Sequence, residues 1–242
     1  MHGPHKFDLT KYKNITEWMN KCQAEMKDYD EIMETGAQLW FDDLFAVIAE
    51  GKEIKTYKNT STIIMGITLY YMSPSPPSRA VDFLIKELEL DAELKQVNLL
   101  EKDQLKPEFL ALNPTHTIPT LDDNGFVVWD SHAILQYLAS KYGKDSTLYP
   151  KDPENQATVN NRLFFNATTF FPRMRDYAAP VFWGRSDTFS ADQRKLVQES
   201  LKWLDGFIES SGGFVAGPTL TIADFAVAAS ISSVDVSMDQ ML

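Results

Sequence analysis

Hydrophobic residues near the start of the chain follow a helical spacing. Ile15, Trp18, Met19 and Cys22 occupy positions i, i+3, i+4 and i+7, which places them on one face of an amphipathic helix. A second apolar stripe follows, formed by Ile32, Met33, Leu39, Trp40, Leu44 and Phe45. We therefore predict a helical segment over residues 1–49. Residues 50–65 are polar and aperiodic, which is typical of a linker.

A different pattern, that of short strands alternating with helices, begins after this linker. The expected strands are Ile67–Met72, Leu94–Val97, Thr117–Leu121 and Phe126–Trp129. The last two flank Asn124-Gly125, a strong signal for a hairpin turn. Apolar residues at helical spacing fill the intervals, with proline at the first helix start. The order β-α-β-α-β-β-α over residues 66–143 is that of a thioredoxin-like α/β domain.

The remainder of the chain is predicted to be helical. Residues 144–153 form a connector rich in Pro and Gly, and residues 154–242 form an all-helical domain that ends early at its C-terminal end. Helices are expected over roughly 154–177, 190–209 and 221–235, interrupted by Pro180, Gly212-Gly213 and Pro218. Thr221 and Asp224 have the spacing of a capping box. Leu220 and Phe225, on either side of them, have the spacing of a hydrophobic staple.

Composition and charge narrow the classes of function. The chain has 34 acidic and 23 basic residues, a net charge of −11, so binding to nucleic acid is disfavoured. A single cysteine, Cys22, excludes an intramolecular disulfide, a redox pair and a cysteine-ligated zinc site. The four histidines are too scattered to indicate any metal centre. No stretch has the roughly 18 apolar residues of a membrane helix, and we find no signal peptide at the start of the sequence. We therefore expect a cytoplasmic protein with no membrane partner.

Several short motifs between residues 66 and 237 occur in the order and spacing of cytosolic glutathione transferases. They are Leu69-Tyr70-Tyr71, Ser75-Pro76-Pro77-Ser78-Arg79-Ala80-Val81, Leu105-Lys106-Pro107-Glu108-Phe109, Asn113–Pro119, Asp130–Ile134, Lys141–Lys144, Leu148–Pro153 and Thr221–Phe225. The chain resembles the insect delta/epsilon classes, with epsilon-like motifs. This resemblance implies a transferase-type helical bundle after the thioredoxin-like domain. It also implies conjugation of the glutathione thiolate to hydrophobic electrophiles, with glutathione as co-substrate, no other cofactor, and a homodimer.

Ser75 is the catalytic candidate. A serine among prolines is ordinarily a turn or capping residue, but in the family this hydroxyl donates to the glutathione thiolate. A thiol with a pKa near ~8.5 is only about 3 % ionised at pH 7, and lowering that pKa by ~2 units requires roughly 2.7 kcal/mol. One charge-assisted hydrogen bond at a helix N-terminus supplies a comparable amount. Ser73 and Ser78 are the neighbouring alternatives.

The resemblance also implies a set of glutathione-binding residues. The family has a cis bond before Pro119, where Ile118 offers its backbone to the cysteinyl unit. Asp130 and Ser131, which could simply cap a helix, hold the γ-glutamyl group in the family. His116 reaches the glycyl carboxylate there. One position departs from the pattern, since Gln104 replaces a common histidine. The full predicted set is Gln104, His116, Thr117, Ile118, Pro119, Asp130, Ser131 and His132.

Candidates for the electrophile site lie on the first helix of the all-helical domain. An aromatic stripe at helical spacing more often belongs to a core than to a pocket. The candidate residues are Ala167, Phe170, Phe171, Met174 and Tyr177. The sequence leaves the electrophile open, as it does the choice between detoxification and an endogenous substrate.

The segments occur in an unusual order. The family continues for two further helices after the Thr221 helix, and residues 7–45 of this chain resemble that ending. A sequence spanning two tandem gene copies, a true permutant or swapped dimer, and a defective product are three explanations. We expect residues 11–45 to pack on the 154–235 bundle.

Other functions remain open on sequence alone. One is a non-catalytic protein of the same fold that binds glutathione or lipophiles, and another is an inactive fusion or truncation product of tandem transferase genes. An assembly module has no need of the serine motif or the γ-glutamyl residues. A thioredoxin-type oxidoreductase is excluded because no cysteine lies near Ser75.

Overall fold

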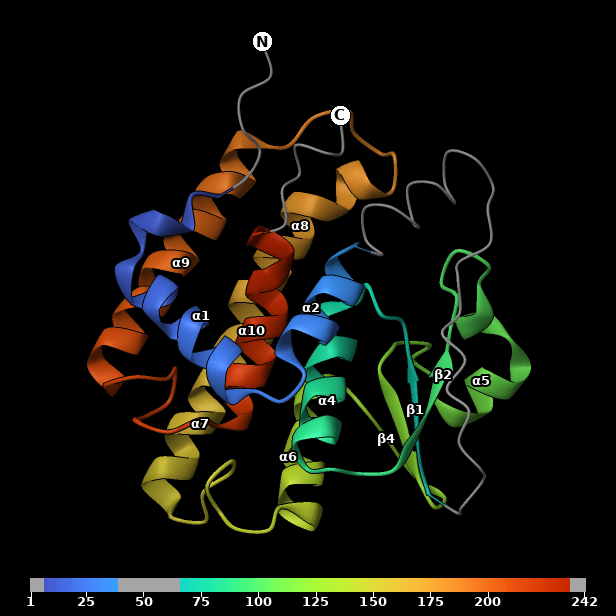
Figure 1. Cartoon of the computed structure of the whole chain (residues 1–242). Coiled ribbons are helices and arrows are strands. Elements are labelled where there is room, and N and C mark those ends of the chain that lie inside the picture. The colour runs from blue at the N-terminus through green and yellow to red at the C-terminus, as the bar shows by residue number, and fades with distance from the viewer. Residues whose placement is uncertain (1–6, 39–65, 236–242) are drawn as a thin grey trace. The chain divides into compact units, whose positions relative to one another are not determined.

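The computed structural model of the chain describes residues 7–38 and 66–235 (Figure 1). The chain forms two compact units: a helical unit of Met1–Glu25 with Asp145–Leu242, and a sheet unit of Met26–Lys144. The predicted linker 50–65 lies outside the described residues, as do Leu39, Trp40, Leu44 and Phe45. In the described ranges, no helix has both the length and the apolar character required to cross a bilayer.

A four-stranded mixed sheet forms the centre of the sheet unit. Its strands are β1 (Ile67–Tyr71), β2 (Ala92–Gln96), β3 (Thr120–Asp123) and β4 (Phe126–Trp129), in the spatial order β2-β1-β3-β4. β1 is parallel to β2 and antiparallel to β3, which is antiparallel to β4. The predicted thioredoxin-like fold is therefore confirmed.

The starts of two strands differ from the prediction for physical reasons. β3 begins at Thr120 rather than Thr117, because Pro119 has no N–H to contribute to a ladder. β2 begins at Ala92 rather than Leu94, because it is an edge strand whose polar residues carry little hydrophobic signal. The predicted hairpin turn is confirmed, since Asn124 and Gly125 both have positive φ, of 53° and 92°.

Helices cover both faces of this sheet. α4 (Pro76–Glu87) and α6 (Ser131–Tyr142) pack together on one face, and α5 (Pro107–Leu112) lies on the other (Figure 1). A short 3-10 helix, η3 (Asp103–Leu105), precedes α5. The core between sheet and helices contains fully buried side chains: Leu69, Val81, Phe83, Leu84, Leu121, Ile134, Leu135 and Leu138.

A further helix, α2 (Tyr29–Gln38), packs against α4 and belongs to the sheet unit. Its Tyr29 ring stacks on Phe83, with ring centroids 5.7 Å apart. Residues 11–45 were expected to pack on the helical bundle; α1 does so, whereas α2 groups with the sheet unit, and residues 39–45 lie outside the described residues. Helical periodicity identifies which face of a helix is buried, but it does not identify the partner.

The helical unit contains α1 (Lys13–Glu25) beside helices from the other end of the chain. These are α7 (Pro153–Phe165), a π-helical turn η4 (Asn166–Phe170), α8 (Phe171–Phe182), α9 (Ala191–Ser211) and α10 (Ile222–Asp235). α1 contacts α9 and α10, and it buries Ile15, Trp18 and Cys22 as its spacing predicts (Figure 1). α8 continues through Pro180 to Phe182, although Pro180 has no N–H to bond the carbonyl of Asp176.

Asp224 is the polar centre of the helical unit. Its fully buried carboxylate accepts hydrogen bonds from the Thr221 N–H at 2.8 Å, the Thr221 hydroxyl at 2.9 Å and the Val215 N–H at 2.9 Å. The indole N–H of Trp18, 206 residues away, donates a fourth at 2.9 Å. Burial raises the pKa of Asp224 to about 6, although these donors favour the charged form.

This arrangement predicts a pH-dependent effect of Trp18→Phe. The folded-state pKa of Asp224 exceeds its ordinary value, so stability from this residue declines as pH rises from about 4 through about 6. Loss of the indole donor raises that pKa further. We expect Trp18→Phe to lower the free energy of unfolding by about 1–3 kcal/mol near pH 8, and by less near pH 5, in urea titrations.

Trp203→Phe is the matched control, because Trp203 is 41 % exposed on α9 of the same unit. An equal loss at both pH values for Trp18→Phe would contradict the role given to Asp224.

Candidate functional site

The strand register brings the predicted glutathione-binding segments to one edge of the sheet. Tyr71 at the end of β1 pairs with Gln96 at the end of β2, and Tyr70 pairs with Thr120 at the start of β3. Thr120 in turn pairs with Trp129 at the end of β4. The segments that follow β1, β2 and β4, and the one that precedes β3, therefore meet at the same edge. They carry Ser75, Gln104, His116–Pro119 and Asp130–His132.

Ser75 is the N-cap of α4, at the point where the chain leaves β1. Its backbone is extended, its N–H donates to the Met72 carbonyl at 2.9 Å, and its side chain makes no capping hydrogen bond. The residue is half-buried. Its hydroxyl therefore lies at a helix N-terminus without being used in the cap, where the helix dipole favours an anion.

The two neighbouring serines are occupied differently. Ser78 is fully buried, and its oxygen accepts the Met72 N–H at 3.4 Å. Ser73 accepts a hydrogen bond from the Gln96 side-chain amide at 3.1 Å. These bonds hold the loop between β1 and α4, so Ser75 is the better candidate for contact with a ligand.

Asn113 organises the loop that leads to the cis peptide bond between Ile118 and Pro119. Its fully buried amide donates to the Thr117 carbonyl at 3.0 Å and to the Thr120 hydroxyl at 2.9 Å. Its carbonyl oxygen accepts the Thr115 N–H at 2.9 Å. Sequence reasoning included Asn113 in a motif but gave it no role. The sequence signal for this role was an Asn-Pro-Thr turn followed by two more threonines.

His116 and Gln104 flank this loop from different segments. His116 is exposed and has a left-handed φ of 48°, and its N–H closes a turn to the Asn113 carbonyl at 3.0 Å. Gln104 lies on η3, and its buried side-chain oxygen has no hydrogen-bond partner in the described part of the chain. Beside it, the Lys106 ammonium pairs with the Asp103 carboxylate at 2.6 Å.

Asp130, Ser131 and His132 begin α6. The Asp130 carboxylate caps this helix by accepting the N–H groups of His132 at 2.9 Å and Ala133 at 3.3 Å. The His132 ring lies 3.4 Å from the same carboxylate, and its hydrogen bond lowers the pKa of Asp130. Asp130 has a φ of 71°, which is strained for a residue other than glycine. Ser131 is 5 % exposed, so the carboxylate is the more accessible group of this pair.

The predicted electrophile-site residues lie in the helical unit, on η4 and α8. Phe170, Met174 and Tyr177 are buried there. Tyr177 packs edge-to-face on Phe7 at 5.3 Å and stacks on Phe189 at 4.9 Å. Burial of these three residues is what an aromatic stripe in a core would also show, and their part in an electrophile site stays a prediction. The other two candidates, Ala167 and Phe171, are half-buried.

A buried ionic cluster that sequence reasoning missed ties the β3–β4 hairpin to α6. The Asp123 carboxylate accepts from the Lys141 ammonium at 2.6 Å and from the hydroxyls of Tyr137 at 2.7 Å and Tyr142 at 2.6 Å. Desolvation opposes ionisation here, but these donors outweigh it and hold the pKa of Asp123 well below its usual value. In the described ranges, no group of three or more His, Cys, Asp and Glu residues could bind a metal ion.

Known proteins that resemble this chain belong to one family. The model of the family described as "Glutathione S-transferase, N-terminal domain" matches residues 69–146. Glutathione S-transferase D7 of Drosophila melanogaster is 45 % identical over 172 residues, which is 70 % of this chain and 75 % of that protein.

Solved structures give the same result. A delta-class glutathione transferase of Nilaparvata lugens is 47 % identical with a TM-score of 0.66, covering 68 % of this chain and 76 % of that chain. An epsilon-class glutathione S-transferase of the housefly, Musca domestica, is 43 % identical with a TM-score of 0.67, covering 69 % and 77 %.

The Asp123 cluster yields a prediction about stability. We expect Lys141→Met to lower the free energy of unfolding near pH 7 several times more than Lys144→Met, because the pair that Lys144 makes in the described part of the chain is with the exposed Glu89. The pKa of Asp123 is depressed in the folded state, so the stability from its pairing is present above its ordinary pKa and is lost as pH falls through the folded value. Chemical denaturation near pH 7 and pH 3 should show the difference between the two variants narrowing at the lower pH without vanishing, because pH 3 still lies above the folded pKa of Asp123.

Proposed function

Because this chain belongs to the insect delta/epsilon-class family of glutathione S-transferases, we propose that it conjugates glutathione to hydrophobic electrophiles, with Ser75 stabilising the thiolate. The free capping position of Ser75 carries this proposal. An N-cap hydroxyl normally accepts a backbone N–H, whereas the Ser75 hydroxyl makes no such bond. The hydroxyl is therefore not fixed by a cap and can turn its O–H, which a cap would not use, toward sulfur.

The chemistry follows from the position of that hydroxyl. Glutathione loses its thiol proton on binding, and the resulting thiolate forms a bond with the electrophilic carbon of the second substrate. The Ser75 O–H and the partial positive charge at the N-terminus of α4 both favour the anion. The serine is not itself the nucleophile.

The remaining segments at the sheet edge are proposed to hold the tripeptide. We assign the γ-glutamyl group to Asp130, Ser131 and His132 at the start of α6. There the Asp130 carboxylate would bind the ammonium group of the ligand, and the N-terminus of α6 would bind its carboxylate. The backbone of Thr117, Ile118 and Pro119 takes the cysteinyl unit as an added strand. His116 and Gln104 serve the glycyl carboxylate.

Ala167 and Phe171 are the residues that we assign to the electrophile site, since both are half-buried. We also propose a cytoplasmic homodimer, as expected for this class. α1 is proposed to stand in for a helix that the family has near its C-terminal end. The hydrogen bond from Trp18 to Asp224 supports this assignment.

Ser75→Ala tests the proposed reaction. Removal of one charge-assisted hydrogen bond to the thiolate should lower kcat/KM for conjugation of 1-chloro-2,4-dinitrobenzene by about 10- to 100-fold. Glutathione binding measured by calorimetry should change little. Ser73→Ala is the matched control, because its hydroxyl is bonded to Gln96. Equal rates for Ser75→Ala and the wild type would refute the role of Ser75.

Gln104→His tests the glycyl end of the site. Glutamine can donate to a carboxylate but adds no charge, whereas a protonated histidine adds one. We expect the variant to have a lower KM for glutathione, most clearly near pH 6, with kcat nearly unchanged. An unchanged KM across pH 6–8 would count against contact between residue 104 and glutathione.

A further inference from the structure

The turn between β3 and β4 contains the one Asn-Gly pair of the sequence, Asn124-Gly125. Both residues are exposed to water. An asparagine followed by glycine is chemically labile, because no side chain hinders the approach of the glycine nitrogen to the carbonyl carbon of the asparagine amide. The two preceding residues, Asp122 and Asp123, each accept a hydrogen bond from one of these reacting groups.

Asp122 holds the nucleophilic nitrogen. The Gly125 N–H donates to the Asp122 carboxylate at 2.7 Å, which is within the distance over which a general base accepts a proton. Side chains alternate along a strand, so on β3 the carboxylate of Asp122 lies on the opposite face of the sheet from that of Asp123. The turn therefore places a proton acceptor beside the nitrogen without involving the buried Asp123 cluster.

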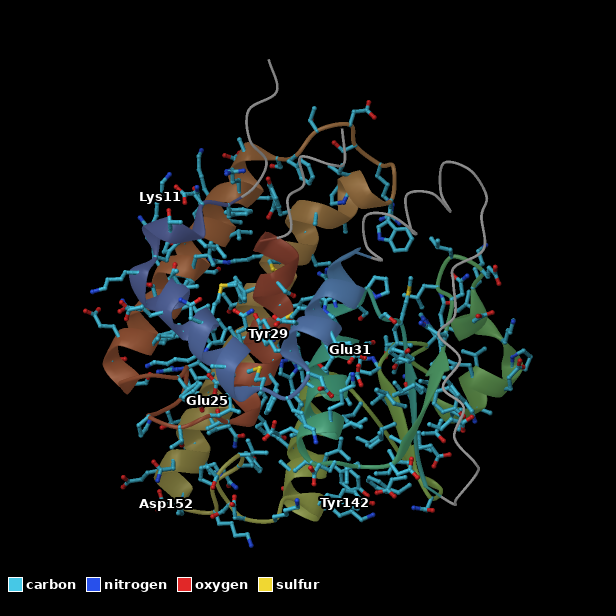
Figure 2. All side chains as sticks on the ribbon, in the orientation of Figure 1. Lys11, Glu25, Tyr29, Glu31, Tyr142 and Asp152 are labelled. Carbon is cyan, nitrogen blue, oxygen red and sulfur yellow. The ribbon has the colours of Figure 1, made fainter. Side chains whose placement is uncertain are left out.

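Asp123 holds the other reacting group. The Asn124 side-chain amide donates to Asp123 Oδ1 at 2.8 Å. The other three donors of the cluster all bond Oδ2: Lys141, Tyr137 and Tyr142. Among the described residues, Asn124 is thus the one donor to Oδ1 of a fully buried carboxylate. Tyr142, which Figure 2 labels, lies at the end of α6, so this bond belongs to the contact between the hairpin and that helix.

We propose that Asn124 is a site of spontaneous deamidation, and that the product weakens the Asp123 cluster. The Gly125 nitrogen forms a bond with the side-chain carbonyl carbon of Asn124, and its proton passes to the Asp122 carboxylate. The C–N bond of the Asn124 amide then breaks, and the amide nitrogen leaves as ammonia with that proton. Water adds to either carbonyl of the cyclic imide, so aspartate and isoaspartate both form. No group is oxidised or reduced.

The product changes the charge beside a buried carboxylate. An amide that donates to Asp123 Oδ1 becomes a carboxylate, which offers only acceptors at neutral pH. The turn then carries three carboxylates in succession instead of two, while Lys141 remains on Oδ2. A lost donor and a like charge at a buried group both destabilise the fold. Isoaspartate also adds a carbon atom to the backbone of a turn that sets the pairing of β3 with β4.

The first experiment ages the full chain near pH 8, below its unfolding temperature, and follows each asparagine by peptide mass spectrometry. We expect the peptide with Asn124 to acquire the mass of a hydrolysed amide, as a mixture of aspartate and isoaspartate. Asn155 is the internal reference, because it is exposed on α7 but is followed by glutamine. Asp122→Asn keeps an acceptor for the Gly125 N–H but removes the base, and should slow the conversion by about tenfold or more.

The second experiment measures the effect of the product. Asn124→Asp reproduces the aspartate form, and Asp tolerates the left-handed φ at this position much as Asn does. We expect it to raise the unfolding constant near pH 7 about ten- to hundredfold in urea titrations. Asn124→Gly is the matched variant, because it removes the donor without adding charge, and it should raise the constant less. Near pH 3 the new carboxyl is protonated and donates to Asp123, so the deficit of Asn124→Asp should shrink.

Two sets of results would overturn the proposal. Conversion at Asn124 no faster than at Asn155 contradicts the site, and an unchanged rate in Asp122→Asn contradicts the role of Asp122 as base. Wild-type stability of Asn124→Asp near pH 7, or a deficit no greater than that of Asn124→Gly, contradicts the effect on the cluster. If Asn124→Asp fails to fold, the urea transition of the aged wild type decides, because its product formed in the folded state. Neither experiment depends on transferase activity, so the proposed function is tested separately.

Discussion

A polar group buried away from water must find hydrogen-bond partners, and this requirement fixes most of the irregular backbone in both units. In the sheet unit, the Asn113 amide determines the conformation of the loop before β3, and Arg79 that of the loop after β1. In the helical unit, Asp224 gathers the start of α10, the backbone at Val215 and the indole of α1. An unmade hydrogen bond at such a position costs about 1–3 kcal/mol, which is comparable to a large part of a domain's stability.

The same requirement distinguishes the two helix N-termini at the sheet edge. At α6 the cap is made by Asp130, whose carboxylate accepts two backbone N–H groups, so the N-terminus is already partly satisfied. At α4 the cap residue is Ser75, and Pro76 and Pro77 after it have no N–H, so the only N–H in the first three positions is that of Ser78, which receives no bond from the Ser75 side chain. Helix stability alone would favour an accepting side-chain oxygen there. A serine hydroxyl that is left out of the cap at a sheet edge is what the proposed contact with a ligand requires.

The sequence predicted what depends on local pattern and missed what depends on tertiary partners. Strand alternation and the Asn124-Gly125 turn specified the sheet, because both signals lie within a few residues. Apolar spacing identified the buried face of α1 but could not assign α2 to the sheet unit, since the pattern is the same for any apolar partner. The Asp123 cluster was missed for a related reason: Lys141 and Tyr142 look like exposed helix residues until the hairpin places a carboxylate between them. The spacing of Phe170, Met174 and Tyr177 likewise predicted buried positions, but spacing does not separate core residues from pocket residues.

The unusual order of segments is compatible with the energetics of packing. Joining Trp18 to Asp224 closes a separation of 206 residues, and relative to a loop of about 20 residues the added entropy of closure is only about 2 kcal/mol. Burial of a large aromatic side chain contributes about 3 kcal/mol, and a hydrogen bond to a charged group contributes about 1.5–3 kcal/mol more. The favourable free energy of the Trp18–Asp224 contact therefore exceeds the entropic cost of closing the chain between the two residues, whichever end of the chain supplies the tryptophan. A helical bundle is specified by complementary faces, and chain order enters only through this slowly varying entropy term.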